Sequence, residues 1–220
     1  MTLLSAGAQA STSTWTASGT TTGTSPVTID ASAVITTSSG QIQVVLTNNL
    51  ANPISAAQEI SGVEITLSNS VSAISLSSSA GTLIDLSGGS VSGVSITHWE
   101  AGSTGALVTL DTINILGQHG GKPYDLIIGP APYTNANPSI TGHSPEIQDT
   151  GTFDLLGSNV TSNITVTGVT FLFGTQTGEA AATGSTTSGG SSLPVPEPAS
   201  IAILGMGLAG LGFARRRRAG

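Results

Sequence analysis

The chain contains no cysteine and few charged residues. The absence of cysteine excludes disulfide bonds, thiolate zinc sites and cysteine nucleophiles. Charged residues make up 8 % of the 220 residues, against about 25 % in a typical soluble domain. Serine, threonine and glycine take their place. A surface that is polar but almost uncharged is more typical of an exported protein than of a cytosolic one.

Basic residues are nearly absent outside the last positions of the chain. Four of the five are Arg215 to Arg218, and the fifth is Lys122. Eleven of the twelve acidic residues lie before Glu197, together with Lys122, so the chain before Glu197 carries a net charge of about −10. Because phosphate binding needs basic patches, this charge excludes a nucleic-acid partner.

The C-terminal region, 195–220, has three parts in a fixed order. An uncharged apolar stretch from Ala199 to Ala214 predicts one short transmembrane helix, because about sixteen helical residues span about 24 Å of a hydrocarbon core of about 30 Å. By the positive-inside rule the arginines that follow stay cytoplasmic, which places the preceding chain outside the cytoplasm. The motif before the helix and the cluster after it are Val195, Pro196, Glu197, Pro198 and Arg215, Arg216, Arg217, Arg218.

This three-part order resembles the PEP-CTERM sorting signal. The resemblance implies that exosortase, a membrane-embedded cysteine protease, recognises Pro196, Glu197 and Pro198 and processes the chain near them. The helix is then a transient stop-transfer segment in the inner membrane, and the mature form is at the cell surface or extracellular. The resemblance also implies an association with exopolysaccharide and biofilm.

An export signal is expected at the other end of the chain, and residues 1–10 contain part of one. Leu3 and Leu4, followed by Ala8-Gln9-Ala10, resemble the end of a signal peptide with an A-x-A cleavage site. The basic and long apolar parts of such a peptide are missing. We therefore interpret 1–10 as a possible remnant of a signal peptide.

Residues 11–177 predict a single all-β domain, a β-sandwich-like ectodomain. Apolar side chains alternate with polar ones at 42–46 and 63–67, and threonine, valine and isoleucine dominate. Ala80-Gly81 and Gly102-Ser103 are predicted to be turns. The predicted strands are Ile42–Leu46, Val63–Leu67, Val71–Leu76, Val91–Thr97, Ala106–Leu110, Asp125–Ile128, Gly151–Leu156 and Ile164–Gly174. After them, 178–194 predicts a flexible linker rich in glycine, serine and threonine.

The last predicted strand changes phase in its middle. Ile164 and Val166 would share one face, but Val169, Phe171 and Phe173 follow out of phase. A β-bulge near the intervening glycine, Gly168, would return all five side chains to one face. The run that contains it, within 137–175, also resembles the C-terminal part of uncharacterised β-rich proteins that carry PEP-CTERM tails.

Histidines and acidic residues are the remaining candidates for chemistry. His98 and Glu100 flank Trp99, and we expect them to share a solvated face while the tryptophan is buried. A metal site would draw on His119, His143, Glu146 and Asp149, but their spacing matches no ligand motif. Loop-ordering hydrogen bonds are the simpler role for His143. A calcium site would draw on four aspartates: Asp111, Asp125, Asp149 and Asp154. These are scattered and form no calcium-loop motif, so we expect neither a metal nor a cofactor.

The pattern predicts a non-enzymatic exported surface or extracellular-matrix protein, and two alternatives stay open. A carbohydrate-binding or adhesin module would need an exposed aromatic platform, for which Trp15, Tyr124 and Tyr133 are available. An enzyme acting on surface polymers would need two carboxylates about 5 to 10 Å apart in a groove, for example Glu100 and Asp111. Clustered aromatic side chains would favour binding, and a carboxylate-lined groove would favour catalysis.

Overall fold

A computed structural model describes residues 10–89, 91, 94–117 and 122–186. Contacts divide the chain into two units, Met1–Gly190 and Ser191–Gly220. Residues 1–9 of the predicted signal-peptide remnant 1–10 lie outside the described residues, as do the sorting motif, the predicted transmembrane helix and the arginine cluster. Within the described ranges, no helix is long and apolar enough to cross a membrane.

The described residues form one sheet of twelve strands, which confirms the all-β prediction. In this part of the chain, helix is confined to a single 3₁₀ turn, Ala56–Gln58, and the short α1 at Pro138–Thr141. The strands are β1 (Ser11–Thr20), β2 (Thr28–Ser38), β3 (Gln41–Asn48), β4 (Ile60–Leu67), β5 (Ser72–Ile84), β6 (Glu100–Thr104), β7 (Leu107–Asp111), β8 (Ile127–Ile128), β9 (Glu146–Ser158), β10 (Val166–Phe173), β11 (Ala180–Thr183) and β12 (Ser185–Thr186).

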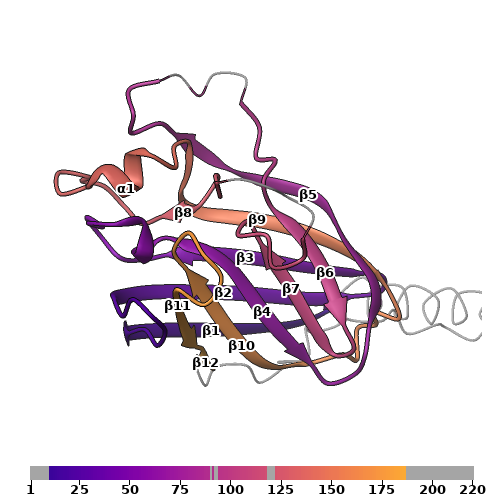
Figure 1. Cartoon of the computed structure of the whole chain (residues 1–220). Helices are drawn as coiled ribbons and strands as arrows, with labels where there is room; N and C mark the ends of the chain where they lie inside the picture. The colour runs from indigo at the N-terminus through magenta and orange to yellow at the C-terminus, as the bar shows by residue number, and fades with distance from the viewer. Residues whose placement is uncertain (1–9, 90, 92–93, 118–121, 187–220) are drawn as a thin grey trace, which may run out of the picture. The chain divides into compact units, whose positions relative to one another are not determined.

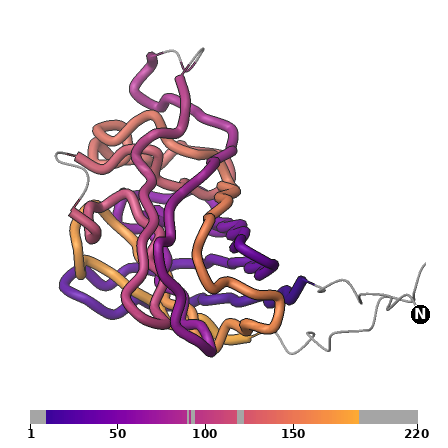
Figure 2. The backbone as a smooth tube through the Cα atoms, turned by 90° about the vertical axis from the view of Figure 1, so that its right-hand side faces the viewer, coloured from indigo at the N-terminus to yellow at the C-terminus, as the bar shows by residue number. Residues whose placement is uncertain are grey.

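The sheet folds over itself into two layers. Strands β5, β9, β3, β2 and β1 pair in that order and make one layer, and β6, β7, β4 and β10 make the other. Figure 1 shows the second layer crossing in front of the first, and Figure 2 shows the molecule turned by 90°. The short β8 joins the layers, since Ile127 pairs with Ile60 of β4 and with Ile147 of β9. The sandwich-like arrangement is therefore one continuous sheet.

Residues 180–186 correct the predicted boundary at 178. β11 pairs with β10, and Ala181 forms a further bridge with Thr22 after the end of β1. β12 then pairs with β1, where Trp15 lies opposite Thr186. This segment therefore links the two layers by backbone hydrogen bonds, which need no large apolar side chains. Its composition, which lacks large apolar residues, is the reason that the sequence predicts a linker there.

The core lies between the layers and follows the predicted alternation. Ile42, Val44 and Leu46 of β3 are buried, and Gln43 between them is exposed. On β4, Val63, Ile65 and Leu67 are buried as predicted. Burial of each such aliphatic side chain contributes about 1.5 to 3 kcal/mol.

The predicted bulge in β10 is confirmed. Val166 pairs with Leu67 and Gly168 with the next residue, Thr66, so Thr167 is the extra residue. Beyond it, Phe171 and Phe173 are fully buried. The bulge thus restores the inward face, as the phase change in the sequence requires.

Three predicted features of local structure were wrong. The described part of Val91–Thr97 forms no strand. Ala80-Gly81 and Gly102-Ser103 lie inside β5 and β6 instead of in turns. The turn between β6 and β7 falls at Gly105, which has a positive φ of 63°. Glycine weakens the sequence signal of a strand. At Gly102 the missing side chain leaves room for Leu116, which packs against the position that a Cβ atom would take.

Candidate functional site

The loop before β4 and the loop that leads to α1 are joined near β8 by two backbone hydrogen bonds, from Asn52 N–H to the Pro130 carbonyl oxygen and from Asn137 N–H to that of Ile54 (Figure 1). The backbone N–H of Ala56 donates to Ser139 Oγ at 3.0 Å, which ties the 3₁₀ turn to α1. Asn48, 1 % exposed, donates through Nδ2 to the carbonyl oxygens of Gln58 and Ile127, both at 2.9 Å. These bonds fix the start of β4 against β8 and so position Glu59.

Glu59 and Glu146 are a buried carboxyl pair, each 0 % exposed. Neither carboxylate oxygen of Glu59 has a hydrogen-bond partner, whereas Ser144 Oγ donates to Glu146 at 2.8 to 2.9 Å. Burial, with repulsion from Glu146, raises the pKa of Glu59 well above its usual value. Burial also raises the pKa of Glu146 to about 7, against the hydrogen bond from Ser144.

Tyr133 and Asp149 extend this pair towards the surface, since both side chains are half-buried. The Tyr133 hydroxyl and Asp149 Oδ1 are buried atoms without a hydrogen-bond partner. Burial first, then repulsion from Asp149, raises the pKa of Tyr133; the Gln148 side chain acts against this rise, and Glu146 and Glu59 add to it. Asp149 has a left-handed backbone with φ 59°, which is unusual outside glycine. We call Glu59, Glu146, Tyr133 and Asp149 the acidic end cluster.

Glu100 and Asp111 form a second carboxyl pair on neighbouring strands. They are direct partners across β6 and β7, so their side chains share one face. Glu100 is 4 % exposed and Asp111 0 %. Burial raises the pKa of Asp111 to about 6, opposed by the N–H of Ile115 and assisted by Glu100. The structure thus brings together the two residues proposed for catalysis, but buries both instead of lining a groove.

His98 departs from its predicted environment in one respect. Trp99 is buried as expected, with its ring centroid 4.4 Å from that of Phe153. Glu100 was expected on a solvated face with His98 and is buried, which is a correction. The partner of His98 is Asp125, whose Oδ2 lies 2.9 Å from Nδ1 and also accepts the N–H groups of Thr97 and His98. Asp125 thereby orders the turn before β6.

The hypothesis of a metal site draws on two loop histidines, His119 and His143. His143 Nδ1 lies 2.8 Å from the carbonyl oxygen of Pro123, which confirms its loop-ordering role. His119 lies outside the described residues. Among the described residues, no three His, Asp or Glu side chains converge closely enough to form a ready-made metal centre. Asp154 is held elsewhere by Ser78 and Gln43, whose hydrogen bonds lower its pKa.

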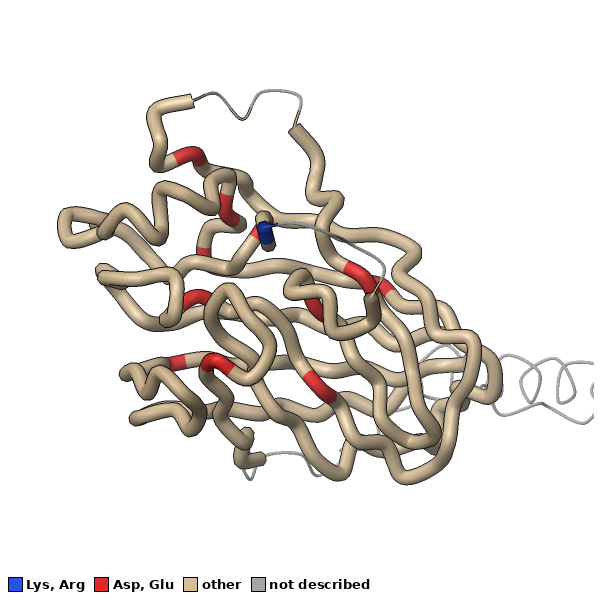
Figure 3. Tube along the Cα trace, viewed as in Figure 1, with Lys and Arg blue, Asp and Glu red and all other residues tan. Residues whose placement is uncertain are grey.

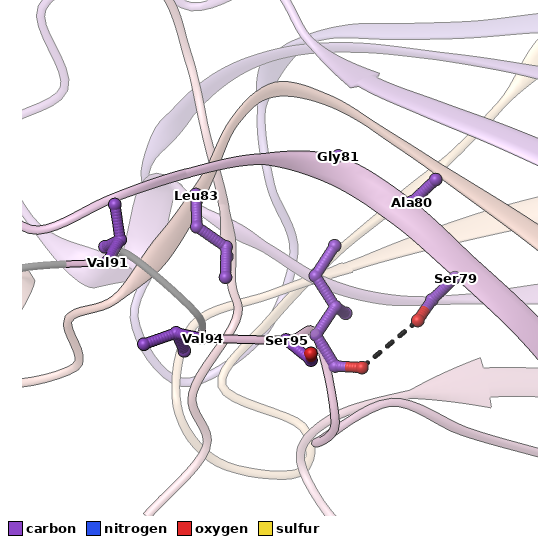
Figure 4. Close-up of a pocket in the computed structure, with 8 residues that line it drawn as sticks. Ser79, Ala80, Gly81, Leu83, Val91, Val94 and Ser95 are labelled. Atoms are coloured by element: carbon purple, nitrogen blue, oxygen red, sulfur yellow. Dashed lines mark hydrogen bonds between the residues drawn. The ribbon is translucent and has the colours of Figure 1, made fainter.

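The described surface also holds a pocket of about 310 Å³ between β5 and the segment that leads to β6 (Figure 4). Ser79 Oγ donates across it to the Ile96 carbonyl oxygen at 3.2 Å. Its lining carries no ionisable group, so the pocket offers no acid or base for catalysis: Ser79, Ala80, Gly81, Leu83, Val91, Val94, Ser95 and Ile96.

The aromatic residues considered for a binding platform lie apart. Trp15 is 6 % exposed and belongs to the core. Tyr124 contacts two imidazole rings, with centroids 5.0 Å from His98 and 6.4 Å from His143. Tyr133 belongs to the acidic end cluster. The described residues therefore present no platform made of these three rings.

Comparison with known proteins decides the identity of the C-terminal region. Residues 194–218 match the PEP-CTERM protein-sorting motif. No curated protein and no solved structure matches the chain significantly. The match covers the predicted motif Val195 to Pro198 and the arginines Arg215 to Arg218. It implies an exported protein whose precursor is membrane-anchored and recognised by exosortase.

Sequence reasoning missed Glu59 and the role of Asp125. Both depend on interactions between distant segments, since Glu146 repels Glu59 and Asp125 bonds to His98. One signal was available: the described residues contain one Lys or Arg, Lys122, so most of their acidic groups lack a basic partner (Figure 3). Buried carboxylates in such a chain are left facing one another.

Proposed function

We propose that this protein is a non-enzymatic surface or extracellular-matrix component, sorted and processed by exosortase and associated with exopolysaccharide. The observation that carries the proposal is the PEP-CTERM motif at 194–218, directly after a β-domain whose last strand ends at Thr186. From Thr186 to Pro196 an extended chain reaches at most about 35 Å. The domain would therefore stay close to the membrane until processing.

The outer face of the β1-to-β9 layer is consistent with a structural role. It carries mainly hydroxyl and amide side chains, several of which bond to one another across strands, together with the exposed Val34 and Leu156. Thr12 and Thr36 hydroxyl oxygens lie 3.0 Å apart, and Gln43 Nε2 donates to Asp154 Oδ1 at 3.0 Å. Such a face is hydrophilic with little charge, which suits contact with hydrated polysaccharide. The inner membrane would be a transient partner and exopolysaccharide a lasting one.

The test follows the protein in strains with and without exosortase. We expect a smaller, released form in the parent strain and a larger, membrane-bound form in the deletion strain. Glu197→Gln should give the larger form even when exosortase is present. The matched control is Glu179→Gln, the same chemical change in the folded domain, which should leave processing unchanged. Equal size and location in the two strains would refute the proposal.

A further inference from the structure

One end of the domain consists of four turns whose sequences contain no Asp, Glu, Lys or Arg. Two backbone hydrogen bonds join the last of these turns to the first two: Gly40 N–H donates to the Val160 carbonyl oxygen at 2.9 Å, and Ser68 N–H donates to that of Thr165 at 2.9 Å. A further backbone bond joins the second turn to the third. We call these turns the uncharged end, and they are 39–40, 68–71, 105–106 and 159–165.

The acidic residues lie away from the uncharged end. Two of the eleven in the described ranges, Glu64 and Asp154, are in the middle of β4 and β9. The other nine lie towards the opposite ends of their strands or in the loops there: Asp30, Glu59, Asp85, Glu100, Asp111, Asp125, Glu146, Asp149 and Glu179. Figure 3 shows the uncharged end free of red and blue, with the red positions farther along the strands. The domain is therefore electrically polar along its strands.

The first and last strands are both oriented towards the uncharged end. Ser11 begins β1 and lies opposite Thr37, directly before the turn at 39–40. Because β12 is antiparallel to β1, with Thr186 opposite Trp15, the chain at Thr186 runs in the direction of Ser11. The matched sorting motif begins at residue 194. The chain that leads to this motif therefore leaves β12 in the direction of the uncharged end.

Electrostatics favours the same end for an approach to a membrane. A surface that contains anionic lipids repels carboxylates within about a Debye length, which is about 8 Å at physiological ionic strength. On β2, Asp30 lies eight residues before Ser38, or about 26 Å along the strand. With the uncharged end nearest the membrane, about three Debye lengths separate Asp30 from the surface. The reverse orientation would bring the nine acidic residues close to it, with Lys122 as the one Lys or Arg of the described ranges to offset them.

We propose that the uncharged end is the surface that the membrane-anchored precursor turns towards a bilayer containing anionic phospholipids, and that the acidic end cluster points away from it. The hydroxyl and amide groups of these turns donate hydrogen bonds without carrying charge, so they are compatible with phosphate and ester oxygens of lipid head groups. The acidic half of the domain is then the part that faces outward. This inference rests on the proposed sorting function, because the membrane anchor belongs to the matched motif.

The test uses the absence of cysteine, which allows one label at one chosen position. Ser39→Cys and Ser25→Cys place the same donor fluorophore at exposed positions beyond the two ends of β2. The full-length chain is inserted into vesicles of phosphatidylcholine and phosphatidylglycerol with an energy acceptor on the head groups. We expect severalfold stronger energy transfer from Ser39→Cys than from Ser25→Cys. Equal transfer, as from a freely tumbling domain, or stronger transfer from Ser25→Cys would overturn the proposal.

Flotation of the same vesicles distinguishes failure of this inference from failure of the proposed function. A labelled chain that does not float with the vesicles would refute the membrane attachment on which both depend. A chain that floats and gives equal transfer from the two labels would refute the orientation alone.

Added charge tests the electrostatic part of the proposal. Asn69→Asp combined with Asn163→Asp adds two carboxylates at exposed positions of the uncharged end. With phosphatidylglycerol present, this variant should lower the transfer from Ser39→Cys about twofold, because each added charge is repelled near the surface. In phosphatidylcholine alone the transfer should not change. Asn135→Asp, the same chemical change in the exposed loop before α1, should leave it unchanged in both. Unchanged transfer in the double variant, or an equal fall in both kinds of vesicle, would contradict the role of charge.

Discussion

Asp111 makes the stability of the folded domain depend on pH. Its pKa rises from the ordinary value of 3.8 to about 6 on folding, chiefly through burial. Between these values the folded chain binds more protons than the unfolded chain. The stabilisation that Asp111 provides is therefore complete below pH 3.8 and is lost as the pH rises through about 6.

The magnitude follows from the size of that pKa change. At about 1.4 kcal/mol for each pKa unit, the rise corresponds to about 3 kcal/mol. Because the effective dielectric constant around a buried group is well above that of dry protein, we expect about 2 kcal/mol of this to be observed. The hydrogen bond from Ile115 N–H to Asp111 Oδ1, 3.1 Å long, is preserved by an amide oxygen. Asp111→Asn thus removes the titration and keeps the turn.

The assay is chemical denaturation of the unaltered chain and of Asp111→Asn at pH 4 and at pH 7.5, with chelator present. The loss of unfolding free energy between the two pH values should be about 2 kcal/mol smaller in Asp111→Asn. Asp30→Asn, an exposed position on β2, should change this loss by less than about 0.5 kcal/mol. If Asp111→Asn keeps the full pH dependence of the unaltered chain, the burial argument for this pair is refuted.

Two further predictions concern the sheet. Deletion of Thr167 removes the bulge, turns Phe171 and Phe173 outward and should cost more than about 4 kcal/mol in urea denaturation. Thr167→Ala keeps the bulge and should cost less than about 1 kcal/mol, and equal losses would contradict the register argument. A chain that ends after Gly178 lacks β11 and β12 and should aggregate on size-exclusion chromatography, because β1 and β10 each lose one of their two pairing strands and gain an exposed edge. A chain that ends after Thr186 should stay monodisperse, and identical elution of the two would show that the closing strands are dispensable.

The sequence predicts those parts of the fold that local patterns determine. The alternation at 42–46 and 63–67 identified the inward faces of β3 and β4, and the phase change at Gly168 identified the bulge. The segment 180–186 escaped prediction because alanine, threonine and glycine give little β signal, although they satisfy the backbone hydrogen bonds that close the sheet. Backbone pairing between distant strands leaves no periodic trace in such a composition.

The candidate site residues were likewise only partly predictable from the sequence. The sorting motif was predictable because its three parts are contiguous and their order carries the physics of membrane insertion. Burial of Glu100 was not predicted, because it depends on tertiary packing such as that of Leu116, which follows the next hairpin and lies against Gly102 on β6. The pairing of Glu59 with Glu146 likewise joins residues 87 positions apart. Only the near absence of basic residues indicated that such acidic pairs would form.

Intact-mass measurement of the protein recovered from outside the cells tests the central claim most directly. The account predicts a chain whose C-terminus lies near Val195, without the apolar segment and without Arg215 to Arg218, in cells that contain exosortase. A released or surface-bound protein whose mass still includes the arginine cluster would contradict it.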